Sequence, residues 1–103
     1  MGTMHEAKQT ALSWIDENRQ RLSDFDMEIW SYHEPAWREY KSAKAYCDLL
    51  RKHGFEVEEG SGDMPTAFMA TWGNGDGPTL ASYAEYDAVP GNSQQAVPYE
   101  APR

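Results

Sequence analysis

Residues 38–58, REYKSAKAYCDLLRKHGFEVE, combine the two periodicities that decide the fold of this chain. Apolar side chains recur every three or four residues, the spacing of one face of an α-helix, at Tyr40, Ala43, Cys47 and Leu50. Gly54 follows at the point where helices often end on a left-handed residue. From Phe55 onward apolar and polar residues alternate, the period of a half-buried strand. The stretch therefore predicts a helix within 38–53 that runs directly into a strand.

Two further helices are expected before this stretch. Between Met4 and Leu22 the apolar residues fall on one helical stripe, so the first helix is predicted over 4–22. Ser23 and Asp26 have the spacing of a capping box, which predicts that a second helix begins here. The Glu34–Pro35 step should end it, because a residue before proline is disfavoured in the α conformation.

Two more strands are expected after the stretch 38–58, over 66–72 and 79–86. The turn-forming residues 74–78 lie between them, so these two strands are predicted to pair as a hairpin. Residues 88–103 are rich in Pro, Gly, Asn and Gln and are predicted to be coil. Three strands with helices arriving from one side would leave a sheet edge uncovered. We therefore expect residues 1–103 to be one part of a single α/β domain that is incomplete.

Composition and charge narrow the classes of protein. The chain of 103 residues is 40% hydrophobic and 13% aromatic with four Trp, which favours a packed fold over disorder. A formal net charge of −8 disfavours binding to nucleic acid or to anionic lipid, and no apolar run approaches the ~20 residues of a membrane-spanning helix. Cys47 is the only cysteine, so no intramolecular disulfide can form, and a reduced, cytoplasmic setting is expected. Residues 1–3, ahead of a second methionine, are interpreted as a cloning remnant.

Glu85 and Asp87 are the first candidates for chemistry. They stand two residues apart where the third predicted strand runs into a loop, and such strand ends often carry ligand sites. On a strand both side chains would leave the same face and could orient one ion or one histidine. The alternative is that they simply end a hairpin in water.

A second polar cluster, residues 32–40, contains His33 among acidic and aromatic residues. His33 could act as a ligand or a base, or it could be a structural residue at the end of a helix. His5 and His53 are interpreted as structural, since no two histidines have metal-ligand spacing. Cys47 lies on the apolar face of its helix, where an inert buried thiol is expected.

The order of several short motifs resembles the N-terminal part of the M20-family amidohydrolases, in the branch of the aminobenzoyl-glutamate hydrolases. The resemblance runs from Trp30 to Gly91 and is carried by His33-Glu34-Pro35-Ala36, Glu39-Tyr40-Lys41-Ser42, Gly54-Phe55-Glu56-Val57, Met64-Pro65-Thr66-Ala67-Phe68 and Glu85-Tyr86-Asp87-Ala88-Val89-Pro90-Gly91. Each motif is weak alone, and their order over most of the chain makes the match specific.

The resemblance implies that the helices and the three strands begin an incomplete zinc-peptidase-like catalytic domain, whose complete form cleaves an amide in N-acyl or N-aroyl amino acids. Two divalent ions, zinc or manganese, would activate water there, in an enzyme that is a homodimer in the family. It implies a supporting role beside the metal site for Asp87. Glu85 stands where some relatives place a metal-binding histidine, so it is a weak candidate ligand, and no metal is expected on this chain alone.

Two functions from different classes follow. In the first, the chain is an N-terminal fragment or one chain of a metal-dependent amidohydrolase, inactive until it joins the remainder of the catalytic domain or a complementary chain. In the second, it is a small acidic α+β interaction module without catalysis, with Trp30, Trp37 and Trp72 as partner-binding anchors. A stand-alone enzyme built on Asp87 and His33 is disfavoured, because no activated nucleophile or metal cage is visible.

Overall fold

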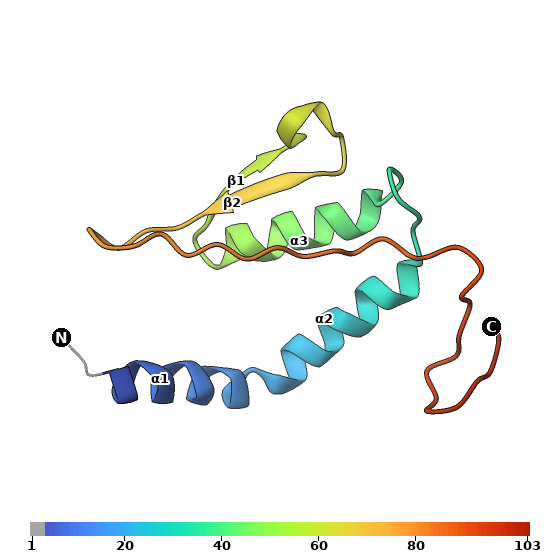
Figure 1. Cartoon of the computed structure of the whole chain (residues 1–103), viewed down its shortest axis with the longest axis horizontal. Coiled ribbons are helices and arrows are strands. Elements are labelled where there is room, and N and C mark those ends of the chain that lie inside the picture. The colour runs from blue at the N-terminus through green and yellow to red at the C-terminus, as the bar shows by residue number, and fades with distance from the viewer. Residues whose placement is uncertain (1–3) are drawn as a thin grey trace. The chain divides into compact units, whose positions relative to one another are not determined.

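The computed structural model describes residues 4–103 and divides the chain into two compact units, with the boundary between Ser31 and Tyr32. Residues 1–3, interpreted above as a cloning remnant, lie outside the described residues. Three helices are followed by two strands, with a short 3₁₀ turn at Ser61–Asp63 between the strands (Figure 1). This order confirms an α/β-type chain in which helices precede strands.

The first unit consists of helix α1, Met4–Glu17, and nearly all of helix α2, Arg19–Tyr32. The break between them is at Asn18, whose side-chain amide donates to the carbonyl oxygen of Trp14 at 2.9 Å. Such a side chain competes with the regular hydrogen bonds of a helix. The predicted boundary at Leu22 and Ser23 is therefore wrong, since α2 passes through both residues without interruption.

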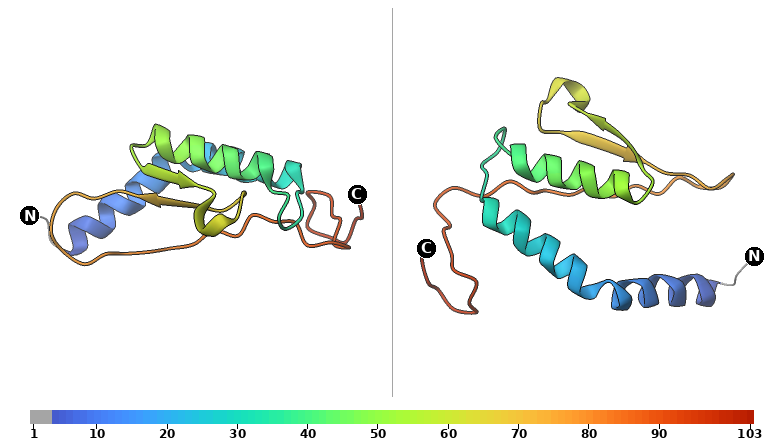
Figure 2. Two further views of the ribbon diagram at one scale, coloured as in Figure 1. Left: turned by 90° about the horizontal axis from the view of Figure 1, so that it is seen from above. Right: turned by 180° about the vertical axis from the view of Figure 1, so that it is seen from behind.

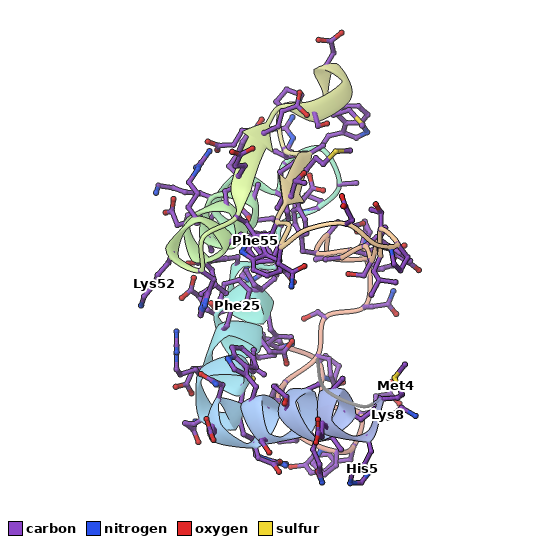
Figure 3. All side chains as sticks on the ribbon, turned by 90° about the vertical axis from the view of Figure 1, so that its left-hand side faces the viewer. Met4, His5, Lys8, Phe25, Lys52 and Phe55 are labelled. Atoms are coloured by element: carbon purple, nitrogen blue, oxygen red, sulfur yellow. The ribbon has the colours of Figure 1, made fainter. Side chains whose placement is uncertain are left out.

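Neither α1 nor α2 contains a buried residue. Ile15 is 47% exposed and Leu22 is 40% exposed, although both lie on the predicted apolar stripe. Figure 3 shows Met4, His5 and Lys8 projecting outward from the first turns of α1. An ion pair between Asp16 of α1 and Arg19 of α2, at 2.8 Å, spans the break between the two helices.

The second unit is built around helix α3, Tyr40–Lys52, which confirms the helix predicted from the first stretch of sequence. Gly54 follows with a φ of 88°, a left-handed conformation that glycine adopts without a Cβ clash. Strand β1, Glu56–Glu59, pairs antiparallel with strand β2, Phe68–Thr71, so that Val57 lies opposite Ala70. Helix α3 contacts both strands and covers one face of this small sheet (Figure 2).

The prediction of a third strand over 79–86 is wrong for the described residues. This segment contains no strand, and β2 pairs with β1 instead of forming the predicted hairpin. After β2 the chain turns and runs back as an extended segment (Figure 1). Leu80 is 91% exposed and Tyr83 is 86% exposed, because no neighbouring strand covers them. The alternating pattern produced an extended backbone but not a ladder, which requires a partner strand.

The core of the second unit lies between α3, β2 and this extended segment. The rings of Tyr46, Phe68 and Tyr86 pack together, with centroids 5.1 Å apart for Tyr46 and Tyr86 and 6.1 Å for Phe68 and Tyr86. Ser42 and Cys47, on α3, are the most buried side chains of the described residues. Tyr86 therefore fastens the extended segment to the core at one end.

Residues 88–103 contain turns and bends but no helix or strand. No helix within residues 4–103 is long and apolar enough to cross a membrane.

Candidate functional site

A hollow of about 330 Å³ lies in the second unit, between the loop that precedes α3 and the end of the extended segment. It is lined by Ala36, Trp37, Glu39, Met64, Thr66, Ala67, Ala84, Glu85, Tyr86 and Asp87. The polar cluster within residues 32–40 and the segment that contains Glu85 and Asp87 thus contribute to one surface. Both candidates, Glu85 and Asp87, line it.

Asp87 is held in place through both of its neighbours. The phenol of Tyr86 donates a hydrogen bond to the main-chain carbonyl oxygen of Thr66. On the other side, the backbone N–H of Ala88 donates to the main-chain carbonyl oxygen of Glu34 at 2.7 Å. Because the chain is fastened immediately before and after it, the backbone of Asp87 has little freedom to move.

Thr66 joins this segment to the loop before α3. It is only 6% exposed, and its hydroxyl donates to the carboxylate of Glu39 at 2.9 Å. Burial of the phenol, with the nearby negative charge of Glu39, raises the pKa of Tyr86 to about 12. Tyr86 therefore keeps its proton at all ordinary pH values and acts as a hydrogen-bond donor.

The loop before α3 is fixed by an unusual helix cap. Glu39, at the N-cap position of α3, makes no capping hydrogen bond with its side chain. The carboxylate of Glu34 caps the helix instead: it accepts from the backbone N–H of Lys41 and of Ser42, both at 2.8 Å, and from the Ser42 hydroxyl at 2.7 Å. A carboxylate at this end of a helix satisfies free N–H groups and complements the helix dipole.

Two opposing effects act on the Glu34 carboxyl. Its burial disfavours the charged form, but the hydrogen bonds from the Lys41 N–H, the Ser42 hydroxyl and the Ser42 N–H outweigh burial and hold the pKa of Glu34 below its usual value. Glu34 is therefore ionised wherever the second unit is folded at neutral pH.

The carboxylates of Glu85 and Asp87 differ from the hydrogen-bonded carboxylates of Glu34 and Glu39. Among residues 4–103 neither takes part in a hydrogen bond, ion pair or ring contact, and none of the residues that line the hollow is basic. No group of three or more His, Cys, Asp or Glu side chains in the described part of the chain could hold a metal ion. The hollow thus presents free carboxylates on a fixed backbone, without a metal cage of its own.

The remaining candidates lie away from this arrangement. His33 is exposed and has a φ of 37°, and it directly follows the last residue of α2. It does not line the hollow. Cys47 is 1% exposed, and burial, together with the negative charge of Glu59, raises the pKa of its thiol. This confirms the prediction of a buried cysteine on the apolar face of its helix.

Sequence reasoning did not assign roles to Glu34, Thr66 or Tyr86, which fix the site. No sequence signal identifies Glu34 as a cap, because it precedes the N-cap residue Glu39 and reaches forward across a loop to the first turn of α3. The pairing of Thr66 with Tyr86 joins distant parts of the chain and has no local pattern.

Comparison with curated proteins gives three similar sequences. The chain is 40% identical over 82 residues to a p-aminobenzoyl-glutamate hydrolase subunit of Escherichia coli, and the match covers 80% of this chain and 17% of that protein. It is 37% and 39% identical over 78 residues to thermostable carboxypeptidases 1 and 2 of Saccharolobus solfataricus, in each case 75% of this chain and 18% of the relative. No protein-family model matches the sequence, and no solved structure is significantly similar to it.

These matches confirm the resemblance to the aminobenzoyl-glutamate hydrolase branch of the M20 amidohydrolases as a partial homology. The homology extends over about three quarters of this chain, and the chain spans less than a fifth of the length of the relatives it matches. Its similarity to these hydrolases is therefore that of a segment.

Proposed function

We propose that this chain, homologous to one segment of several amide-cleaving enzymes, supplies the N-terminal part of the catalytic domain of a metal-dependent amidohydrolase. The complete enzyme would hydrolyse N-acyl or N-aroyl amino acids. The observation that carries the proposal is the position of Asp87. It lies in one of the motifs that resemble the family, and its backbone is held by hydrogen bonds of both neighbouring residues. Its carboxylate is free and lines the hollow.

In this proposal Asp87 supports the reaction centre without forming it alone. The described residues do not fit a metal site by themselves, since no cluster of three ligands is present among residues 4–103. Ligands for zinc or manganese would have to come from the remainder of the catalytic domain or from a complementary chain. The contribution of this chain is a fixed carboxylate that can accept a hydrogen bond from a ligand supplied by that partner.

The extended segment 79–86 supports the need for such a partner. Its residues are extended and unpaired, and both Leu80 and Tyr83 are almost fully exposed. An unpaired strand-like segment with apolar side chains is a surface on which a further strand can pair. The proposed partner would cover it and complete the sheet, in an enzyme that we expect to be a homodimer.

The proposal is tested with a chimaera in which the matched segment of the E. coli hydrolase is replaced by the corresponding residues of this chain. We expect p-aminobenzoyl-glutamate hydrolysis to be retained by the chimaera and to fall by roughly 10–100-fold in Asp87→Asn, a loss of the size seen for groups that orient metal ligands. The control is Asp76→Asn, the same chemical change at an exposed turn residue. A folded chimaera in which both variants keep full activity would contradict the role of Asp87.

A second experiment tests whether the chain acts alone. We expect no turnover of an aroyl-glutamate by the purified chain of 103 residues with Zn²⁺ or Mn²⁺ added. Turnover above background, abolished by a chelator, would show that the chain is sufficient and would overturn the need for a partner.

The alternative is an acidic interaction module without catalysis. It is favoured by the exposure of the three expected anchors: Trp30 is 38% exposed, Trp37 is 64% exposed and Trp72 is 57% exposed. A module should be a monomer with a single cooperative melting transition, measured by size exclusion and calorimetry. A piece of a larger domain should self-associate or melt without cooperativity.

A further inference from the structure

One residue, Glu34, contacts both parts of the second unit that form the hollow. Its side-chain oxygens are both engaged by the first turn of α3: Oε2 accepts from the Lys41 N–H, and Oε1 accepts from the N–H and the hydroxyl of Ser42. Ser42 is fully buried, so this end of the interaction is shielded from water. The carboxylate is thus bound to a rigid element.

The main chain of the same residue holds the other part. The Glu34 carbonyl oxygen accepts the N–H of Ala88 at 2.7 Å, and Ala88 directly follows Asp87. The bond joins two segments that are far apart in sequence and belong to no common sheet. Asp87 is thereby held in position relative to α3 through a single residue, Glu34.

The backbone around Glu34 restricts how it can turn. Pro35 fixes its own φ and keeps the preceding residue out of the α region. His33, on the other side, has a positive φ of 37°, which is rare for a residue with a side chain. Because its neighbours restrict the backbone of Glu34 and its carboxylate is bound to α3, the residue that caps the helix also presents its carbonyl oxygen to Ala88.

We propose that Glu34 is a positioning residue that fastens the Asp87 segment to the N-terminus of α3. It does not line the hollow, so it acts through Ala88 and not on a ligand. A catalytic use of Asp87 rests on the proposed function, whereas the coupling of α3 to Ala88 through Glu34 does not. The coupling can therefore be tested in the chain itself, without any assay of hydrolysis.

The experiment is amide hydrogen exchange of the 103-residue chain by nuclear magnetic resonance. In Glu34→Gln we expect the amides of Lys41, Ser42 and Ala88 to exchange roughly tenfold faster, the factor that corresponds to one lost hydrogen bond of ordinary strength. The amide proton of Ala88 should also move upfield as its hydrogen bond lengthens. The control is Glu85→Gln, the same change at a carboxylate without a partner, which should leave all three amides unaltered.

Two further variants separate positioning from general stability. Glu34→Ala should accelerate hydrogen exchange at the Ala88 amide more than Glu34→Gln does, because glutamine keeps one acceptor oxygen and the shape of glutamate. Ser42→Ala removes only one donor to the carboxylate and leaves Glu34 in place, so it should accelerate Ala88 by a smaller factor, about twofold to threefold.

The outcome that overturns the proposal is specific. If Lys41 and Ser42 exchange faster in Glu34→Gln while the rate and the resonance of Ala88 stay as in the unaltered chain, the cap and the carbonyl contact are independent. If Glu34→Gln unfolds the whole unit, Ser42→Ala decides. A larger increase in exchange rate, relative to the unaltered chain, at Ala88 than at the amide of buried Cys47 supports the coupling. Equal increases at both amides contradict it.

Discussion

Helices α1 and α3 differ by one residue in length, 14 against 13, yet the chain uses them in different ways. Helix α3 buries Ser42 and Cys47, is capped from outside by Glu34 and contacts both strands. Helix α1 buries no residue. A helix of this length is only marginally stable by itself in water, so packing decides which helix can anchor a site.

The difference teaches where the site can be placed. Both parts of the hollow are attached to α3. The loop is attached through Glu34, and the extended segment is attached through the ring of Tyr86, which packs on Tyr46. Neither α1 nor the part of α2 that precedes Tyr32 belongs to that unit. Substitutions in the second unit should therefore have large effects, and matched substitutions in the first unit should have small ones.

The largest effect is expected for Tyr86→Ala. It removes the ring that packs on Tyr46 and Phe68 and the hydrogen bond to Thr66, and should lower the free energy of unfolding by ~2–4 kcal/mol. Urea denaturation followed by circular dichroism measures it. The matched control is Tyr83→Ala, three residues earlier and 86% exposed, for which less than about 0.5 kcal/mol is expected. Equal losses in the two variants would contradict the packing described here.

Cys47→Ser should have the next largest effect. The thiol is 1% exposed, and a hydroxyl in its place would be buried without an assured partner, at a cost of ~1–3 kcal/mol. Ala11→Ser, in the exposed helix α1, serves as the comparison and should cost no more than about 0.5 kcal/mol. A loss in Ala11→Ser as large as that in Cys47→Ser would remove the distinction between the two helices.

Loss of the cap should depend on pH. The pKa of Glu34 is lower in the folded chain than in the unfolded one, so its contribution is complete above the unfolded value of about 4.3 and disappears as the pH falls through the folded value. Glu34→Gln should therefore be less stable than the unaltered chain by roughly 1 kcal/mol at pH 7, with a smaller difference at pH 3. Urea midpoints at the two pH values measure this. A difference that stays constant, or that grows in acid, would be inconsistent with a charged cap.

The smallest effect is expected in α1. Leu12→Ala shortens a side chain that is 58% exposed, and should change the free energy of unfolding by less than about 0.5 kcal/mol. Leu50→Ala, at a half-buried position of α3, should cost at least twice as much in the same measurement. If Leu12→Ala proved as damaging, α1 would have a packing partner, and the comparison of the two helices would have to be redrawn.

Much of the local structure could be predicted from the sequence. The helical face of Tyr40, Ala43 and Cys47 and the glycine after it gave α3 and its end, and alternation gave β1. These signals succeed because hydrogen bonds in helices and the alternation of strands repeat over a few residues. The break at Asn18 was missed because a single side-chain hydrogen bond, not a pattern, produces it.

The candidate site was predictable only in part. Glu85 and Asp87 were found because two carboxylates at the end of an alternating run are visible in one stretch. Their support was not found: Glu34, Thr66 and Tyr86 act across long distances in sequence. The expected third strand also failed for this reason, since alternation predicts an extended backbone but does not supply the strand that must pair with it.

The sequence by itself determined helix α3, the two segments that become β1 and β2, the buried thiol and the residues whose order resembles a family of hydrolases, because each depends on neighbours a few positions away. Only the tertiary structure decided that residues 32–40 and 84–88 share one hollow, that Glu34 caps α3 while holding Ala88, and that Asp87 is fixed between two fastened neighbours. The physical reason is that these contacts join segments that come together only when α3, β2 and the extended chain pack around Tyr86.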